Sequence, residues 1–185
     1  EEGLVGDKID YERGTIRLGD EVYPLNDTHF PTIDPNEPYR LTEEEEWAIS
    51  RVTQSFKNSN RLDEHIRFLF SKGSMYMTFN GNLLFHGCIP LKPDGSFMGL
   101  TFEGKTYEGR AAFRKFEQIA RMAYFSRNEV ERKKGRDIMW YLWCGEKSPL
   151  FGKKRMTTFE RYFVDDKTTH TEEKTPYFDL RERED

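Results

Sequence analysis

The stretch NGNLLFHGCIP, residues 80–90, joins a turn signal to a short apolar run that ends on a histidine. Asn-Gly is the favoured dipeptide of a tight β-hairpin, so Asn80 and Gly81 predict a turn between two strands. The Leu-Leu-Phe run that follows indicates a strand buried on both faces. Gly87 then allows the backbone to turn sharply. The stretch therefore predicts a hairpin that holds His86 at the end of a buried strand.

His86 has two interpretations. A sheet fixes the position of a side chain at the end of a strand, and a metal ligand needs that rigidity. On spacing alone, however, a structural histidine bonded to the backbone is favoured. The other histidines, at positions 29, 65 and 170, form no His-x-His or His-Glu-x-x-His pattern with it. The residues by themselves leave both interpretations open.

A second candidate site lies in GKKRMTTFER, residues 152–161. Lys153, Lys154 and Arg155 follow a glycine and precede two threonines at a predicted helix start. Cationic side chains together with the free N–H groups of a helix N-terminus can bind a phosphate group. The alternative, which the pattern alone favours, is a solvated basic loop.

Short hairpins and several helices are predicted along the rest of the chain, which gives an α+β order of elements. Alternating apolar and polar residues around two turn signals predict a three-stranded meander over about residues 8–25. A further small hairpin is expected within residues 94–109, with its turns at the two Gly-containing dipeptides, Asp94-Gly95 and Glu103-Gly104.

Helices are predicted from apolar periodicity and from capping residues. Thr42 and Glu45 have capping-box spacing ahead of a helix with an apolar stripe, and Thr157 and Glu160 repeat that spacing further on. Three more helices are expected at residues 61–70, around residues 112–123 and up to residue 145. The apolar positions that should form helix faces are Trp47, Ile49, Val52, Phe56, Leu62, Ile66, Leu69, Phe70, Ala112, Phe116, Ile119, Ala120 and Ala123.

The composition is polar for a folded protein. Of the 185 residues, 34% are charged and 36% hydrophobic, but aromatic residues reach 15% and can fill a core with few side chains. The low aliphatic content indicates that part of the packing surface is supplied elsewhere. The net charge of −4 gives no general attraction to nucleic acid or to an anionic membrane. No apolar run approaches the roughly 18 residues that span a bilayer.

Cys88 and Cys144 are far apart in the sequence and form no metal-type pair. Cys88 lacks a neighbour that would mark it as a nucleophile, so it is interpreted as a small buried residue. Two unpaired cysteines are typical of a reduced, cytoplasmic setting. The missing initiator Met, and a helix that has barely begun at the last residues, are expected of a segment of a larger protein.

These stretches carry a family resemblance. NGNLLFHGCIP resembles the His-Gly motif that supplies one metal ligand in the calcineurin-like metallophosphoesterases. Together with KIDYERGTIRL, WYLWCGEKSPLFGKKRMTTFERYF and KTPYFDLRE, it resembles the central portion of class III fructose-1,6-bisphosphatase, the type common in Firmicutes. The similarity covers nearly the whole chain, and residues 140–163 are its most specific part.

The resemblance implies a two-metal phosphatase, usually manganese-dependent, that removes the 1-phosphate of fructose 1,6-bisphosphate in gluconeogenesis. By motif match it implies that His86 is a metal ligand. Lys153, Lys154 and Arg155 are expected near the substrate phosphates from their charge and position alone. The implied architecture is an α/β metallophosphatase sandwich, of which this chain is an α+β fragment with short antiparallel hairpins and several helices.

Several motifs of the family are missing from this sequence. The family site also needs an Asp-x-His pair, a Gly-Asp-x-x-Asp-Arg segment, a Gly-Asn-His-Asp segment and a late Gly-His motif. Gly19-Asp20 begins like the second of these, but a hairpin turn explains it better. One histidine cannot hold two metals. We therefore expect the missing motifs to lie beyond both ends, and we expect the chain alone to be inactive.

The predicted organisation is one segment, residues 1–185, that forms the central part of a larger catalytic domain. Within it, residues 1–40 form a β-meander and loop, residues 41–145 form helices and hairpins that include the His-Gly motif, and residues 146–185 form a basic loop and a C-terminal helical region. Exposed strand edges favour a homo-oligomer. The alternative function is a non-catalytic binding or interaction module related to metallophosphatases.

Overall fold

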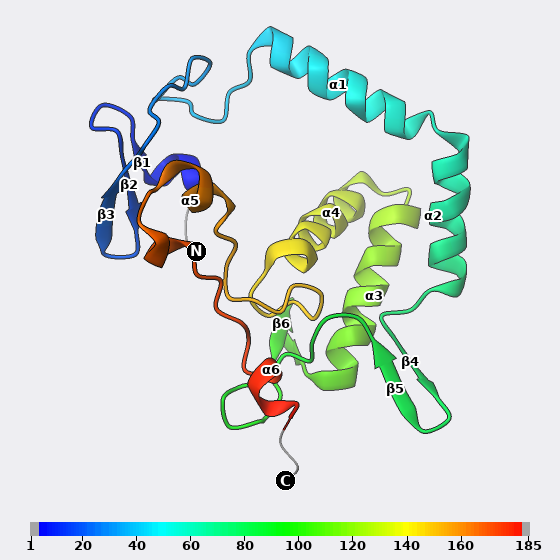
Figure 1. The fold of residues 1–185 in the computed structure, drawn as a ribbon. Helices are drawn as coiled ribbons and strands as arrows, with labels where there is room; N and C mark the ends of the chain where they lie inside the picture. The colour runs from blue at the N-terminus through cyan, green and yellow to red at the C-terminus, as the bar shows by residue number, and fades with distance from the viewer. Residues whose placement is uncertain (1–3, 183–185) are drawn as a thin grey trace. The chain divides into compact units, whose positions relative to one another are not determined.

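The structure is a computed structural model that describes residues 4–182 (Figure 1). It confirms an α+β fold of helices and short antiparallel hairpins. The described residues divide into two compact units. Unit 1 contains residues 4–67 and 157–171, and unit 2 contains residues 68–156 and 172–182. The division into residues 1–40, 41–145 and 146–185 stays a prediction.

Unit 1 contains the predicted meander. Its antiparallel strands, in the order β1-β2-β3, are Ile9–Asp10, Thr15–Leu18 and Glu21–Pro24. Ile16, Leu25 and Val164 are buried and form the core, so the meander packs on residues at the end of helix α5 (Thr158–Phe163). The two parts are also joined because Asn26 N–H donates to the carbonyl of Phe163 at 2.9 Å.

Helix α1 (Glu43–Lys57) begins at the predicted capping box. The N–H of Glu45 donates to Thr42 Oγ1 at 3.3 Å, and the Glu45 carboxylate accepts from Thr42 N–H at 2.8 Å. Helix α2 (Asn60–Lys72) follows after a short break. Neither helix has a buried residue in the described part of the chain, so the apolar stripes predicted for them are present in the sequence but not covered.

The hairpin predicted around Asn80-Gly81 is formed in unit 2 by β4 (Tyr76–Phe79) and β5 (Asn82–Phe85). Asn80 has φ +48° and Gly81 has φ +76°, the left-handed conformations that a two-residue hairpin turn requires. The predicted burial of β5 on both faces is wrong, since Leu83 is 49% exposed and Leu84 is 47% exposed. The reason is that, among the described residues, β4 and β5 form a sheet of just two strands.

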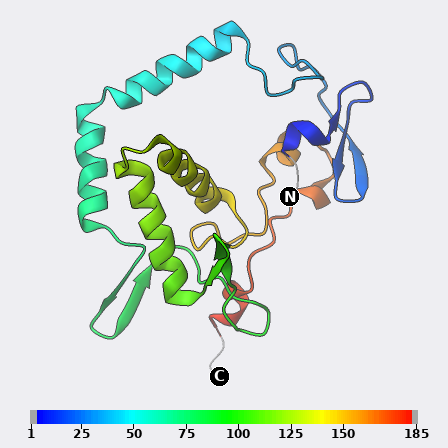
Figure 2. The ribbon, with the colours of Figure 1, turned by 180° about the vertical axis from the view of Figure 1, so that it is seen from behind.

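The core of unit 2 lies where two antiparallel helices meet a second hairpin. The hairpin consists of β6 (Leu100–Phe102) and β7 (Lys105–Tyr107), and the helices are α3 (Gly109–Phe125) and α4 (Glu129–Cys144). The buried residues of this core are Leu100, Ala112, Phe116 and Leu142. Both ribbon views show α3 and α4 side by side (Figures 1 and 2).

The approach of α3 and α4 depends on a glycine. A Cβ placed on Gly135 would lie 2.5 Å from the Cβ of Ala123, closer than packed atoms come. Ala123 belongs to the helix face that the sequence predicted, and Ala112, Phe116 and Ile119 of that face are buried as expected. Two small residues at the crossing point therefore let the helices pack closely.

The short C-terminal helix α6 (Tyr177–Leu180) starts directly after Pro176, as predicted. The capping box predicted at Thr157 and Glu160 is wrong, because the Thr157 side chain makes no cap hydrogen bond. Its Oγ1 instead donates to the carbonyl of His170 at 3.0 Å. Among residues 4–182, no helix combines the length and the apolar character needed to cross a membrane.

Candidate functional site

The His86–Gly87 turn follows β5 directly. His86 is exposed and makes no hydrogen bond or ion pair with any residue in the described part of the chain. The backbone-bonded structural histidine favoured by spacing alone is therefore not what the structure shows. The end of β5 fixes the backbone position of His86. The imidazole ring faces solvent, and both of its nitrogens are available.

Gly87 fixes the turn by close packing. Its φ is +87°, in the left-handed region that favours glycine, and a Cβ there would lie 2.1 Å from the carbonyl oxygen of Pro149. The next residue, Cys88, donates its N–H to the same oxygen at 2.8 Å. The turn therefore packs against the loop that follows α4, and this contact joins residues more than 60 positions apart in the sequence. The glycine predicted the sharp turn but not the contact.

Cys88 lies behind the turn as a buried residue, as the sequence predicted. Its side chain is fully buried, and its Sγ lies 3.7 Å from the carbonyl oxygen of Ser148. Burial raises the pKa of the Cys88 thiol, against a hydrogen bond from Thr175 that lowers it. A neutral thiol is a poor nucleophile, so Cys88 has a packing role.

Ser148 holds the loop in place from inside. It is fully buried, and its Oγ donates to the carbonyl of Leu142 at 2.6 Å. The same Oγ accepts from the N–H of Leu150 at 3.1 Å. These bonds tie the last turn of α4 to the segment that contacts the His86–Gly87 turn.

The predicted cationic segment continues from this loop. Its backbone pairs with residues 173–175: the N–H of Lys154 donates to the Glu173 carbonyl at 2.9 Å, and the N–H of Thr175 donates to the Gly152 carbonyl at 3.1 Å. The Lys153 ammonium pairs with Glu172, and the Lys154 ammonium lies 2.5 Å from Glu173. Carboxylates therefore balance the two lysines.

The structure assembles only part of the predicted phosphate site. Lys153, Lys154 and Arg155 belong to unit 2, and Arg155 is exposed. Thr157 and the helix start belong to unit 1, where Thr157 is buried and bonded to His170. Helix α5 has 6 residues, so the helix dipole at its N-terminus contributes little to binding a phosphate.

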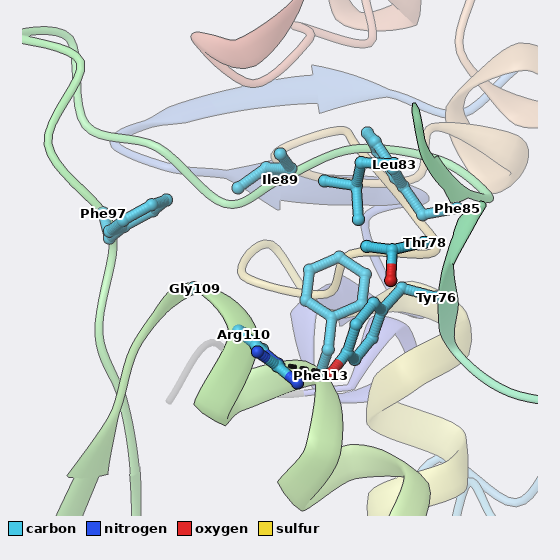
Figure 3. A pocket seen from close by; sticks show the side chains of 9 residues that line it. All are labelled: Tyr76, Thr78, Leu83, Phe85, Ile89, Phe97, Gly109, Arg110 and Phe113. Atoms are coloured by element: carbon cyan, nitrogen blue, oxygen red, sulfur yellow. Dashed lines mark hydrogen bonds between the residues drawn. The ribbon is translucent and has the colours of Figure 1, made fainter. Parts of the chain in front are cut away.

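An apolar cavity of about 230 Å³ lies beside β5 (Figure 3). It lies between the β4–β5 hairpin and the first turn of α3, and Phe85, the residue before His86, belongs to its lining. At its rim the Tyr76 hydroxyl accepts hydrogen bonds from Arg110 Nε at 2.6 Å and from Arg114 Nε at 3.1 Å. The hydrogen bond from Arg110, aided by Arg114, lowers the pKa of Tyr76.

The sequence patterns did not indicate Tyr76, Arg110 or Arg114 as site residues. Arg110 and Arg114 are four apart on α3, so they share a face, and that spacing was a usable signal. Tyr76 lies 34 residues before Arg110, and no local pattern relates them. His86 is not among the residues that line the cavity.

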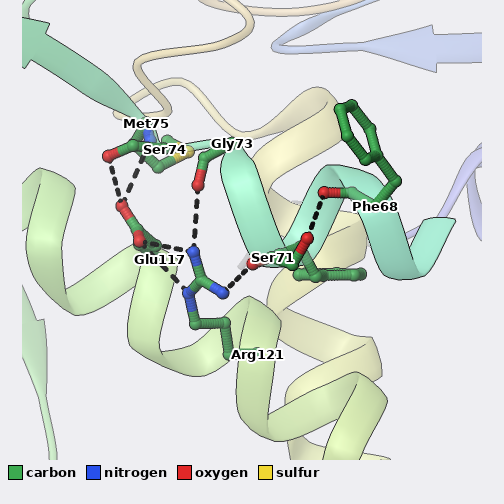
Figure 4. Close-up of polar contacts among 8 residues, drawn as sticks. Phe68, Ser71, Gly73, Ser74, Met75, Glu117 and Arg121 are labelled. Atoms are coloured by element: carbon green, nitrogen blue, oxygen red, sulfur yellow. Dashed lines mark hydrogen bonds and ion pairs between the residues drawn. The ribbon is translucent and has the colours of Figure 1, made fainter. Parts of the chain in front are cut away.

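A separate polar cluster anchors the start of β4 to α3 (Figure 4). Glu117 accepts from Ser74 Oγ at 2.8 Å and from Met75 N–H at 3.2 Å, and it pairs with Arg121 at 2.9 Å. Arg121 also donates to the carbonyls of Phe70 and Gly73 at the end of α2. Partial burial raises the pKa of Glu117, but the hydrogen bonds from Ser74, Met75 and Arg121 outweigh it and lower the pKa overall.

Within residues 4–182, no group of three or more His, Cys, Asp or Glu side chains is arranged to hold a metal ion. A catalytic metal site needs several protein ligands. The described residues therefore do not form a complete metal site, and His86 is at most one ligand of such a site.

Comparison with known proteins gives a consistent family. The family model described as Firmicute fructose-1,6-bisphosphatase matches residues 1–185. A protein of Clostridium botulinum (strain Alaska E43 / Type E3) named fructose-1,6-bisphosphatase class 3 is 56% identical over 186 residues, which is 100% of this chain and 28% of that protein. No solved structure matches this chain.

Two further relatives have the same name. The protein of Clostridium novyi (strain NT) is 54% identical over 98% of this chain and 27% of its own length. The protein of Listeria innocua serovar 6a is 55% identical over 95% of this chain and 27% of its own length. The chain therefore spans little more than a quarter of the curated relatives it matches.

Proposed function

The chain belongs to the Firmicute fructose-1,6-bisphosphatase family, and from that premise we propose that it forms part of an enzyme that hydrolyses the 1-phosphate of fructose 1,6-bisphosphate. The observation that carries the proposal is the match of the family model to residues 1–185. The relatives named fructose-1,6-bisphosphatase class 3 support it. A cytoplasmic location and self-association through strand edges belong to the same proposal.

In this proposal His86 is one ligand of a manganese site that residues outside the described part complete. Three observations support the assignment: the imidazole follows a strand end, it is exposed, and the Gly87–Pro149 contact fixes the turn that carries it. A metal pair, when bound, would neutralise the negative charge of the phosphate. The contribution of this chain is a rigid position for one imidazole.

Lys153, Lys154 and Arg155 contact substrate phosphate in the same proposal. The two lysines are paired with Glu172 and Glu173, so a phosphate would have to replace a carboxylate as their partner. The Lys154–Glu173 pair is exposed, and exposed ion pairs contribute little to stability, so an exchange at Lys154 costs little. We expect Lys154→Ala to raise KM for the sugar bisphosphate more than it lowers kcat in the intact protein.

The β4–β5 hairpin joins a larger sheet of a metallophosphatase sandwich in this proposal. An isolated two-stranded hairpin is marginally stable in water. Both Leu83 and Leu84, which point to opposite faces of β5, are about half exposed. A strand inside a sandwich is covered on both faces, and such cover would bury both Leu83 and Leu84.

The experiment compares the 185-residue chain with the intact protein. The chain alone, supplied with manganese, should not hydrolyse fructose 1,6-bisphosphate, whereas the intact protein should. In the intact protein His86→Ala should lower metal content and rate together, while the control His65→Ala, an exposed position on α2, should leave both unchanged. Unchanged metal content in His86→Ala would remove the ligand assignment. An intact protein without activity would favour a non-catalytic module.

A further inference from the structure

One face of the β4–β5 hairpin forms a wall of the apolar cavity shown in Figure 3. Tyr76 and Thr78 alternate along β4, and their partners in the ladder are Phe85 and Leu83 of β5. Side chains of directly paired residues lie on the same face of a sheet. Phe113 of α3 is 4% exposed and closes the opposite side, with its ring centroid 6.1 Å from those of Tyr76 and Phe85. Every lining residue belongs to unit 2, so the cavity is formed without unit 1.

The size and the lining of the cavity indicate a ligand with an apolar body. An apolar cavity of about 150 Å³ takes up benzene in another protein, and this cavity has about 230 Å³. It therefore has room for a body of one or two rings. Phe85, Phe97 and Phe113 are among its lining residues, and aromatic side chains favour flat rings that stack or meet edge to face. A sugar bisphosphate is a poor fit, because its hydroxyl groups would lose hydrogen bonds with water at apolar walls.

Two arginine side chains meet at the rim of the cavity without a carboxylate. Arg110 and Arg114 both donate from Nε to the Tyr76 hydroxyl, at 2.6 Å and 3.1 Å, so the two guanidinium groups lie close together. Like charges at such short range repel each other. Neither arginine forms an ion pair among residues 4–182, and no Asp or Glu lines the cavity. Both side chains are exposed, and their Nη groups make no hydrogen bond with the described residues, so these donors are available to an anion.

We propose that this cavity and the two arginines at its rim bind an amphipathic oxyanion, a molecule with an apolar body of one or two rings and one carboxylate or phosphate group. The body occupies the cavity beside Phe113, and the oxyanion accepts hydrogen bonds from the Nη groups of Arg110 and Arg114. Guanidinium groups bind carboxylates and phosphates in a planar, often bidentate geometry. The negative charge also offsets the repulsion between the two guanidinium groups. This binding does not require phosphatase activity.

The test is a ligand-observed NMR titration of the intact protein without added metal. The anionic probes are phenylacetate and benzylphosphonate, which share a benzyl body and carry a carboxylate or a phosphonate. Benzyl alcohol is the neutral probe with the same body, and acetate is an anion without it. Arg114→Gln removes one charge from the rim. Lys115→Gln is the matched control, since it removes a charge from the same helix, but its ammonium lies over the Tyr107 ring.

At least one of the two anionic probes should bind the wild type about tenfold or more tightly than benzyl alcohol or acetate. Arg114→Gln should weaken binding of that anion about tenfold and leave the affinity for benzyl alcohol unchanged, because only the anion uses the guanidinium group. Lys115→Gln should change neither affinity by more than about twofold. Thr78→Trp, at an exposed lining position, should abolish binding of both kinds of probe, because the indole fills the cavity.

Four results would overturn the proposal. If neither anion binds, other polypeptide of the intact protein fills the cavity. If the anions bind no more tightly than benzyl alcohol, the arginines play no part. Equal losses in Arg114→Gln and Lys115→Gln, or unchanged binding in Thr78→Trp, would place the anion elsewhere. Displacement of phenylacetate by fructose 1,6-bisphosphate would assign the cavity to the sugar bisphosphate instead.

Discussion

The backbone N–H of Cys88 donates a hydrogen bond to the carbonyl oxygen of Pro149, with the two atoms 2.8 Å apart. The bond joins the segment after β5 to the loop after α4. The same oxygen lies where a side chain at Gly87 would have to be. The position of His86 therefore depends on a contact that only the folded chain makes.

Gly87→Ala should strongly destabilise the chain. The added Cβ would meet the Pro149 oxygen, and φ +87° strains any residue with a side chain. We expect a loss of roughly 2–4 kcal/mol in the free energy of unfolding. Gly81→Ala is the control, since Gly81 also has positive φ but no atom within 4 Å of its Cβ position; it should cost roughly 1 kcal/mol. Urea unfolding of the 185-residue chain measures both, and equal losses would contradict the close contact.

Ser148→Ala should leave a buried carbonyl without its partner. Ser148 Oγ donates to Leu142 O at 2.6 Å inside the protein. Removing one partner of a buried hydrogen bond costs about 1–3 kcal/mol. Ser96→Ala, which removes an exposed hydroxyl bonded to Asp94, should change stability by less than about 0.5 kcal/mol. The two variants are compared by urea unfolding, and a Ser148→Ala loss as small as the control's would rule out this role.

Because of Glu117, the free energy of unfolding should fall at acid pH. Its pKa in the folded chain is lowered from its ordinary value of 4.5. A carboxyl group with a lowered folded pKa contributes stability above its unfolded pKa, and the contribution is lost as pH falls through the folded pKa. The advantage of the wild type over Glu117→Gln should therefore be constant above about pH 5.5 and shrink below pH 4.5. Urea unfolding at a series of pH values measures this difference, and a difference independent of pH would contradict the lowered pKa.

The two cysteines should differ in reactivity. Burial raises the thiol pKa of both residues, but Cys88 is fully buried whereas Cys144 is half-buried, so access to the thiol is what differs. We expect a thiol reagent to modify Cys144 in the native 185-residue chain and to leave Cys88 unmodified, because both access and the thiolate are needed. In urea both should react. Peptide mass spectrometry distinguishes the sites, and rapid native modification of Cys88 would contradict its burial.

The two capping-box patterns show how far local signals reach. At Thr42 and Glu45 both partners lie within one turn, and the predicted bonds form. At Thr157 the same pattern fails, because the hydroxyl finds the carbonyl of His170 and is buried there. A tertiary partner 13 residues away therefore overrides a local preference.

The predicted burial of β5 was wrong for a related reason. A run of consecutive apolar residues predicts cover on both faces, but it does not say which polypeptide supplies that cover. Leu83 and Leu84 are about half exposed among the described residues. The same holds for the apolar positions of α1, whose spacing was predicted and whose partner was not.

The sequence by itself determined the meander, the hairpin turn at Asn80-Gly81, the start of α1 and the helix faces of α3, because each depends on neighbours within a few residues. It also placed His86 at a strand end. Only the tertiary structure decided that Gly87 packs on Pro149 and that Lys153 and Lys154 meet Glu172 and Glu173. Those contacts join segments far apart in the chain, and their free energy depends on which surfaces come together when the whole chain packs.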